Sequence, residues 1–286
     1  MLGIKHPVIS AGMYIAGGPE LVAAVSNAGG LGVIGGLYFT PDDLATTIRE
    51  VKRDYTEGKL DELIDIVACS GAKLFVSAVG VAPTDVVDKL HANGIFYMNL
   101  AGHPKHVTKA CAAGADIICA QGSEAGGHAG EIPTSVLVPA CVDLVTKYKS
   151  PLTGQPVQLV AAGGICDGRG VAASFMYGAS AVWIGTRFVT AKESSAPEES
   201  KQVNELEDLL NKGIIPLDHE IKTIRGSGVL SKEIIKQSAM RPMSIACGLI
   251  NNGQQSAADI IAEMVAEAVQ CLRGASSVVV KSDYLD

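Results

Sequence analysis

One loop of the sequence has a composition that suits chemistry better than packing. It covers residues 120–130 and reads A-Q-G-S-E-A-G-G-H-A-G. A short apolar run before it predicts a buried strand, and a helical pattern begins near Thr134. Because Gly126 and Gly127 carry no Cβ, the backbone can turn freely there and approach a flat ligand closely. The loop presents His128, whose imidazole can exchange a proton near neutral pH, as a candidate acid or base; a solvated loop histidine is the alternative.

Two glycine turns follow predicted strands further along the chain. Gly163 and Gly164 follow one strand, and Gly185 and Thr186 follow the next. Glycine turns expose backbone N–H groups that bind anions, and the turns after the last two strands of a barrel are a recurrent phosphate site. The first turn leads into a predicted helix start at 167–170, and Thr186 adds a hydroxyl donor. Two ordinary strand-to-helix turns are the alternative, but the paired positions favour a phosphate site.

These loops require a scaffold of strands and helices in alternation. The predicted strands cover residues 8–10, 31–34, 74–77, 95–100, 116–119, 157–161 and 181–184. The predicted helices cover residues 19–28, 40–55, 60–69, 84–92, 104–113, 135–148 and 168–177. The strands are almost entirely apolar, which indicates a parallel sheet covered by helices. A parallel series of this length fits a (β/α) barrel better than a doubly wound sheet.

One strand is missing from this alternation. Where a strand is due, residues 54–59 read D-Y-T-E-G-K, which is too charged for a buried parallel strand. The sequence therefore predicts a TIM-type (β/α)8 barrel that lacks one strand. Barrel closure requires strand number, tilt and stagger to agree, so we expect a smaller barrel or a gap beside the second strand, weaker ligand binding, and a homo-oligomer as one way to cover the gap.

The predicted barrel domain covers residues 1–193. A small cap or flanking segment follows at 194–245, and a C-terminal helix returns to the barrel within 246–286. Helical patterns at 198–212 and 256–273 make this a small helical C-terminal flank.

Composition excludes several classes of protein. The formal net charge is -7 and the sequence has no basic cluster, which argues against a nucleic-acid or anionic-membrane partner. It has no apolar run long enough to span a bilayer and no signal-peptide layout. A cytosolic or organelle-lumen location remains, and we expect the cytoplasmic one. The 7 cysteines form no C-x-x-C pair and no metal-ligand spacing, so we expect reduced, mostly buried thiols and no metal site.

Five segments together resemble the nitronate monooxygenases, formerly called 2-nitropropane dioxygenases. They read P-V-I-S-A-G-M, A-V-S-N-A-G-G-L-G, A-Q-G-S-E-A-G-G-H, A-A-G-G-I-C-D-G-R-G and W-I-G-T-R-F. Members of that family are FMN-dependent barrels related to the FMN-containing enoyl-ACP reductases. The resemblance covers about residues 4–193 and departs at a strand of the type P-F-G-V-N-L, which this chain lacks, and in a short tail.

The resemblance implies a site and a reaction. The FMN phosphate would lie on Gly163, Gly164, Gly185 and Thr186. The flavin ring would lie near Gly12, Met13 and Gln121, with His128 on its substrate side. The implied reaction is oxidation of an alkyl nitronate, such as propionate-3-nitronate, by O₂ to a carbonyl compound and nitrite. The alternatives are an NAD(P)H-dependent reductase of a quinone or enoyl thioester, and a barrel that is catalytically silent because of the missing strand.

Other residues near the predicted site have less specific roles. His103 and His106 follow a strand, but histidines at helix starts are commonly solvated. Glu124 either supports His128 or caps the loop. Cys119 and Cys166 flank the site, and a thiol nucleophile would also need a nearby base. We expect three further histidines at the surface: His6, His91 and His219.

Overall fold

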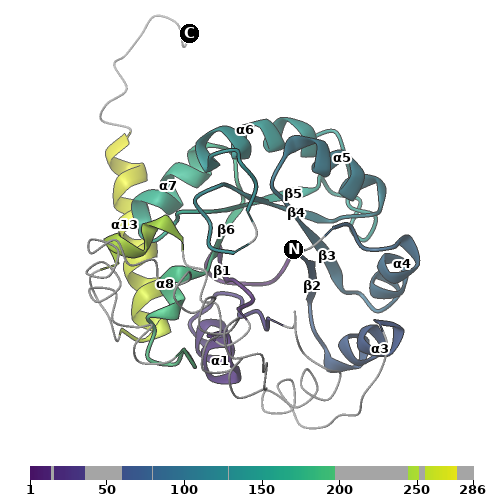
Figure 1. Cartoon of the computed structure of the whole chain (residues 1–286), viewed down its shortest axis with the longest axis horizontal. Helices are drawn as coiled ribbons and strands as arrows, with labels where there is room; N and C mark the ends of the chain where they lie inside the picture. Colours follow the sequence, from purple (N-terminus) through teal and green to yellow (C-terminus); the bar gives the residue numbers. More distant parts are fainter. Residues whose placement is uncertain are drawn as a thin grey trace, which may run out of the picture.

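The computed structural model describes residues 1–13, 16–35, 60–78, 80–127, 129–196, 244–250 and 255–275. Six strands form one sheet in the order β1-β6-β5-β4-β3-β2, and every pair is parallel. The strands are β1 (Val8–Ser10), β2 (Leu74–Ser77), β3 (Phe96–Ala101), β4 (Ile117–Gln121), β5 (Gln158–Ala162) and β6 (Ala181–Ile184). The sheet curls into an incomplete barrel, with helices around its outside (Figure 1).

The helices connect successive strands and cover the outer face of the sheet (Figure 1). They are α1 (Pro19–Asn27), α3 (Leu60–Ser70), α4 (Thr84–Ala92), α5 (Pro104–Ala112), α6 (Thr134–Val145), α7 (Gly168–Met176), the short α8 (Thr186–Val189) and α13 (Ala257–Ala275), together with the 3-10 helix η1 (Ile245–Leu249). The prediction of a parallel α/β barrel is confirmed. Most predicted elements lie within a few residues of the observed ones.

The core has two layers, as alternating side chains on barrel strands require. One cluster of buried side chains lies inside the barrel and comes from the strands, with Ile9, Met98, Cys119, Val160 and Trp183 among its members. A larger cluster lies between the strands and the surrounding helices. Because the interior is packed with side chains, a ligand site must lie at an end of the barrel rather than along its axis.

The second predicted strand, at 31–34, is wrong as a regular strand. It forms two isolated parallel bridges, one between Leu31 and Ile9 of β1 and one between Ile34 and Met13 beyond the end of β1. A Cβ on Gly35 would lie 2.6 Å from backbone atoms of Met13, so the backbone passes β1 unusually closely at this glycine. The sequence correctly predicted an apolar segment, but it did not predict the close approach of Gly35 to Met13.

The other end of the sheet is β2. Within the described residues β2 pairs only with β3, and all four of its residues are half-buried, whereas those of β6 are fully buried. The predicted gap would lie between β2 and residues 31–34. The charged stretch 54–59 and the predicted helix 40–55 lie outside the described residues.

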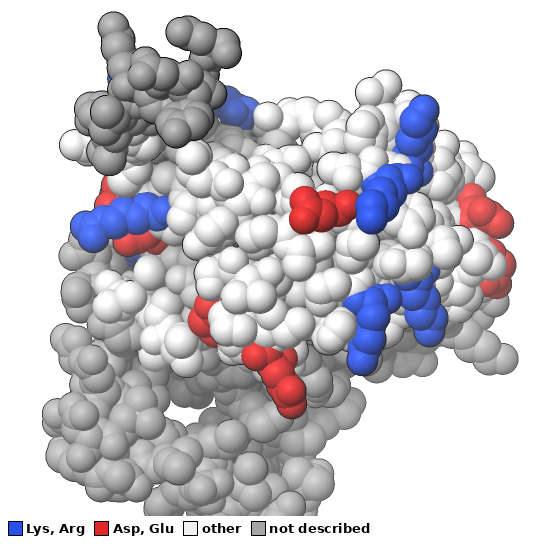
Figure 2. All heavy atoms as spheres, turned by 90° about the horizontal axis from the view of Figure 1, so that it is seen from above, with Lys and Arg blue, Asp and Glu red and all other residues white. Residues whose placement is uncertain are grey.

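The C-terminal helix α13 packs against α7 and α1 (Figure 1). It confirms the helix predicted at 256–273, whereas the one predicted at 198–212 lies outside the described residues. Within the described residues, no helix is both long enough and apolar enough to cross a bilayer. Figure 2 shows the molecule of Figure 1 from above. On this face, positive and negative side chains are scattered among wide uncharged areas.

Candidate active site

The segments singled out in the sequence meet at the carboxyl edge of the sheet. Gln121 ends β4 and is the register partner of Ala162, the last residue of β5. Ala162 pairs with Trp183 of β6, and β6 pairs with β1. Gly163 and Gly164, Gly185 and Thr186, and Gly12 and Met13 therefore follow neighbouring strands at one end of the barrel, as predicted.

The first glycine turn has the backbone of an anion-binding loop. Gly163 and Gly164 both have positive φ, 106° and 69°. A Cβ on Gly163 would lie 2.7 Å from the hydroxyl oxygen of Thr134, so no other residue fits there. The backbone N–H of Gly163 lies on the last rung of the β5–β6 ladder, where Ala162 pairs with Trp183. Within the described residues, the backbone N–H groups of Gly164 and Ile165 donate to no acceptor. The turn borders a cavity of about 320 Å³ and offers these donors to a ligand.

The second glycine turn lies against the residues that follow β1. A Cβ on Gly185 would be 3.4 Å from Cβ of Ala11 and 3.8 Å from the sulfur of Met13. A Cβ on Gly12 would be 3.2 Å from the carbonyl oxygen of Ile34. Met13 thus lies beside Gly185, and Gly12 lies against Ile34, so one ligand could contact both loops.

Thr186 makes a contact that the sequence did not indicate. Its hydroxyl oxygen accepts a hydrogen bond from the backbone N–H of Ser244, at 2.9 Å, just before η1. Ser244 also donates its own hydroxyl to the carbonyl oxygen of Glu124, at 2.7 Å. One residue far along the chain thus joins the second glycine turn to the central loop.

Glu124 caps helix α6. Its two carboxylate oxygens accept from the backbone N–H of Thr134 at 3.1 and 3.0 Å, and one accepts from the Thr134 hydroxyl at 2.8 Å. The Cβ of Glu124 also packs 3.1 Å from where a Cβ of Gly164 would lie. Glu124 therefore caps helix α6, and the same side chain supports the first glycine turn. Its other predicted role, support of His128, involves a residue outside the described ones.

The N-terminus of α7 is occupied by carboxylates. Asp167 accepts from the N–H of Gly170 at 2.8 Å, and Glu267 of α13 accepts from the N–H of Gly168 at 2.7 Å. Glu267 also pairs with Arg169. Protein carboxylates therefore already use the N–H groups of Gly168 and Gly170 at this helix start. The glycine turn alone remains available.

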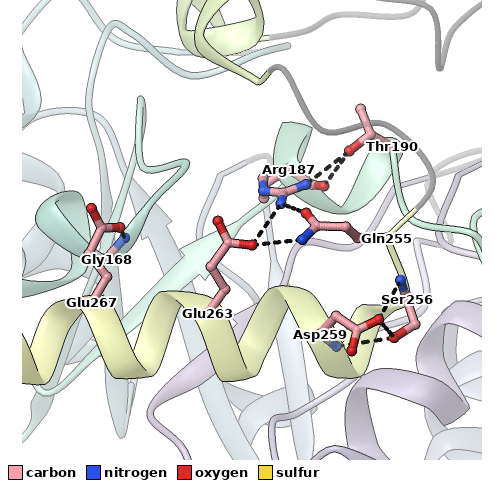
Figure 3. Close-up of polar contacts among 8 residues, drawn as sticks. All are labelled: Gly168, Arg187, Thr190, Gln255, Ser256, Asp259, Glu263 and Glu267. Carbon is pink, nitrogen blue, oxygen red and sulfur yellow. Dashed lines mark hydrogen bonds and ion pairs between the residues drawn. The ribbon is translucent and has the colours of Figure 1, made fainter.

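Arg187 follows Thr186 but lies away from the turn, toward α13 (Figure 3). It is buried, bonds to the side chain of Gln255, and lies 3.8 Å from the carboxylate of Glu263. Its second guanidinium nitrogen donates to the hydroxyl of Thr190 at 3.3 Å. Burial lowers the pKa of Arg187, and Glu263 opposes that effect. Arg187 therefore holds the second turn onto α13.

His128, the candidate acid or base, lies outside the described residues. His103 is exposed, and its Nδ1 accepts from the N–H of Lys105 at 3.1 Å, so it caps α5. His106 is also exposed, and desolvation, with Lys105 beside it, lowers its pKa. The interpretation of His103 and His106 as helix-start residues agrees with these positions.

The cysteines flanking the site lack the features of a nucleophile. Cys119 is fully buried inside the barrel, and burial raises its pKa far above the ordinary value. Burial also raises the pKa of Cys166, and Asp167 adds to that effect. All 7 thiols are free, as expected, but only Cys119 and Cys141 are fully buried. Within the described residues no group of His, Cys, Asp and Glu could hold a metal ion.

The expectation that His91 is a surface residue is wrong. Its Nε2 lies 2.8 Å from a carboxylate oxygen of Asp116, which is fully buried just before β4. Asp116 also accepts from the Ser150 hydroxyl at 2.6 Å and from the backbone N–H of Tyr97 at 2.8 Å. This network lies at the amino end of the strands, opposite the candidate site, where barrel residues serve stability.

Known proteins share both sequence and fold with this chain. The family model described as nitronate monooxygenase matches residues 1–58 and 53–214. The two matched pieces overlap at residues 53–58, within the stretch where the sequence predicts a missing strand. A protein from Staphylococcus saprophyticus named "Probable nitronate monooxygenase" is 33% identical over 254 residues, which cover 69% of this chain and 69% of that protein.

Two further comparisons extend over more of the chain. The "(3aS,4S,5R,7aS)-5-hydroxy-7a-methyl-1-oxo-octahydro-1H-indene-4-carboxyl-CoA dehydrogenase" of Mycobacterium tuberculosis is 34% identical over 271 residues, covering 89% of this chain and 72% of that protein. The structure of FabK from Thermotoga maritima superposes with a TM-score of 0.76 at 26% identity, covering 97% of both chains. With a family model that matches most of its length, the chain belongs to the nitronate monooxygenase family of oxidoreductases.

Proposed function

We propose that this protein is an FMN-dependent nitronate monooxygenase. It would oxidise an alkyl nitronate, such as propionate-3-nitronate, with O₂ to a carbonyl compound and nitrite. The observation that carries the proposal is the turn at Gly163 and Gly164, where the N–H groups of Gly164 and Ile165 are free within the described residues and lie beside the turn that holds Thr186. Family membership supports the reaction class.

The residues present fit FMN. A phosphate needs several N–H or O–H donors in a loop without Cβ atoms. Gly164, Ile165 and Thr186 would supply the donors, and Gly163 and Gly164 leave the space that a Cβ would fill. Gly12, Met13, which lies beside Gly185, and Gln121 would border the flavin ring. When bound, FMN would supply the electron-accepting chemistry that nitronate oxidation requires.

The chain's own residues would bind and orient the substrate. His128 would accept a proton from a neutral nitroalkane, or donate a hydrogen bond to an anionic nitronate. Glu124 would fix the start of its loop, because its carboxylate bonds to Thr134 and its carbonyl oxygen bonds to Ser244. The packed barrel interior below would keep water from entering through the barrel axis.

Nitrite release tests this function. Purified protein loaded with FMN is mixed with propionate-3-nitronate in air, and nitrite is measured by a colorimetric assay. We expect the wild type to release nitrite and His128→Asn to release far less. His103→Asn is the matched control, because His103 is exposed and asparagine also caps helices. An FMN-loaded wild type that releases no nitrite would refute the proposal.

A second function is favoured by one observation. The relative that matches 89% of this chain is a dehydrogenase named for a CoA thioester. FMN would then exchange electrons with NAD(P)H and a thioester or quinone rather than with O₂. Anaerobic mixing with NADH distinguishes the two: rapid bleaching of the flavin absorbance near 450 nm favours this second function, and an unchanged spectrum favours the nitronate monooxygenase.

A further inference from the structure

Ser244 joins two parts of the candidate site that are far apart in the sequence. Its backbone N–H donates to the hydroxyl oxygen of Thr186 at 2.9 Å, and its hydroxyl donates to the carbonyl oxygen of Glu124 at 2.7 Å. The N–H of Ile245 reaches the same carbonyl oxygen at 3.2 Å. Ser244 is buried, so these bonds are shielded from water.

The direction of the bond to Thr186 has a chemical consequence. A threonine hydroxyl has one proton to donate and two lone pairs to accept with. Because Ser244 supplies a proton to the oxygen, the hydroxyl proton of Thr186 must point elsewhere. Within the described residues, the Thr186 hydroxyl donates to no acceptor. It is therefore a half-buried donor at the edge where the two glycine turns meet.

We infer that Ser244 is a positioning residue for the cofactor phosphate: its N–H holds Thr186 as a donor, and its hydroxyl fixes Ser244 itself to the central loop at Glu124. The inference rests on the proposed FMN site. It adds a residue from the C-terminal part of the chain to a phosphate site otherwise built from the two glycine turns. A donor held in this orientation favours a phosphate over a neutral hydroxyl group.

The ratio of affinities for FMN and riboflavin tests this role, because the two ligands differ only in the phosphate. Each dissociation constant is measured by flavin fluorescence titration of the purified apoprotein. A general loss of folding weakens both ligands equally and leaves the ratio unchanged. Loss of the phosphate donor weakens FMN binding but not riboflavin binding, and so lowers the ratio of FMN affinity to riboflavin affinity.

Two substitutions at Ser244 separate its N–H from its hydroxyl. Ser244→Ala keeps the N–H and removes the hydroxyl, whereas Ser244→Pro removes both. The φ of Ser244 is -61°, which proline adopts without strain. We expect the FMN-to-riboflavin ratio of Ser244→Pro to fall roughly tenfold below that of Ser244→Ala, similar to the loss in Thr186→Val. Ser244→Pro should cause no further loss in a Thr186→Val background.

A folded Ser244→Pro variant with the same ratio as Ser244→Ala would overturn the role of Ser244 while leaving the FMN site intact. A wild type that binds FMN no better than riboflavin would overturn the phosphate site and, with it, this inference. If Ser244→Pro does not fold, Ser244→Gly keeps the N–H but frees its backbone. Its ratio should then fall below that of Ser244→Ala, and equal ratios would overturn the inference.

Discussion

Glu124→Ala should destabilise the fold and weaken FMN binding together, because Glu124 both caps α6 and packs on the first glycine turn. The substitution removes a charged acceptor from the N–H of Thr134 at the positive end of the helix. Loss of such a cap costs about 1–2 kcal/mol. The Thr134 hydroxyl loses its bond to Glu124 but keeps the carbonyl oxygen of Gly163 as an acceptor at 3.1 Å, so its loss is partial.

The total cost is therefore about 2 kcal/mol, which corresponds to a fall in melting temperature of about 4–8 °C. Glu124→Gln retains one acceptor oxygen, so we expect roughly half of this effect. Glu131→Gln, an exposed acid in the same connection between β4 and α6, is the matched control and should leave the melting temperature unchanged.

The assay is differential scanning fluorimetry of the apoprotein, followed by FMN titration of each variant. The order of FMN affinity should be wild type, Glu124→Gln, then Glu124→Ala. The reasoning is refuted if Glu124→Ala melts at the same temperature as Glu131→Gln, since the cap would then contribute nothing. If it melts lower but binds FMN normally, the cap holds α6 without supporting the turn.

Three further predictions concern other parts of the molecule. Gly164→Asp should yield folded, colourless protein, because its carboxylate repels the phosphate. Gly164→Asn has the same shape without the charge and should bind FMN more tightly than Gly164→Asp. Equal FMN affinities in a titration would show that the phosphate does not bind at this turn. Burial raises the pKa of both Cys111 and Cys141 from 9.0 to about 11, so the unfolded chain loses these two protons at lower pH than the folded protein. The free energy of unfolding should therefore fall as the pH rises from 9 toward about 11. Thermal melts across this range should show a smaller fall in melting temperature for a Cys111→Ala, Cys141→Ala variant than for the wild type. Asp116→Ala leaves two buried donors, the Tyr97 N–H and the Ser150 hydroxyl, without their acceptor and removes the partner of the half-buried His91. It should cost about 3 kcal/mol or more by urea denaturation, with flavin affinity unchanged because the network lies at the opposite end of the barrel.

The sequence could predict the strands and helices, and also the glycine turns that follow the strands at the candidate site. Apolar runs and glycine turns are local signals, so the strands β1, β2 and β6 were predicted at their observed bounds. The order of parallel strands then brings Gly163 and Gly185 to one edge without further information.

The sequence could not predict contacts between distant segments. Ser244 bonds to Glu124 across 120 residues, and Glu267 reaches Gly168 across 99. Neither contact has a local pattern, because each depends on how η1 and α13 pack against the barrel. For the same reason His91, in an ordinary amphipathic helix, gave no sign of its bond to the buried Asp116.

FMN binding by the wild type tests the central claim most directly. The predicted lack of one strand would remove one wall beside β2, so we expect protein that is purified with less than one FMN per chain. Added FMN should restore one FMN per chain and raise the melting temperature, because a ligand that binds only the folded state stabilises it. No FMN binding at millimolar FMN, with an unchanged melting temperature, would contradict the account. Full FMN occupancy after purification would show instead that the gap beside β2 does not weaken the site.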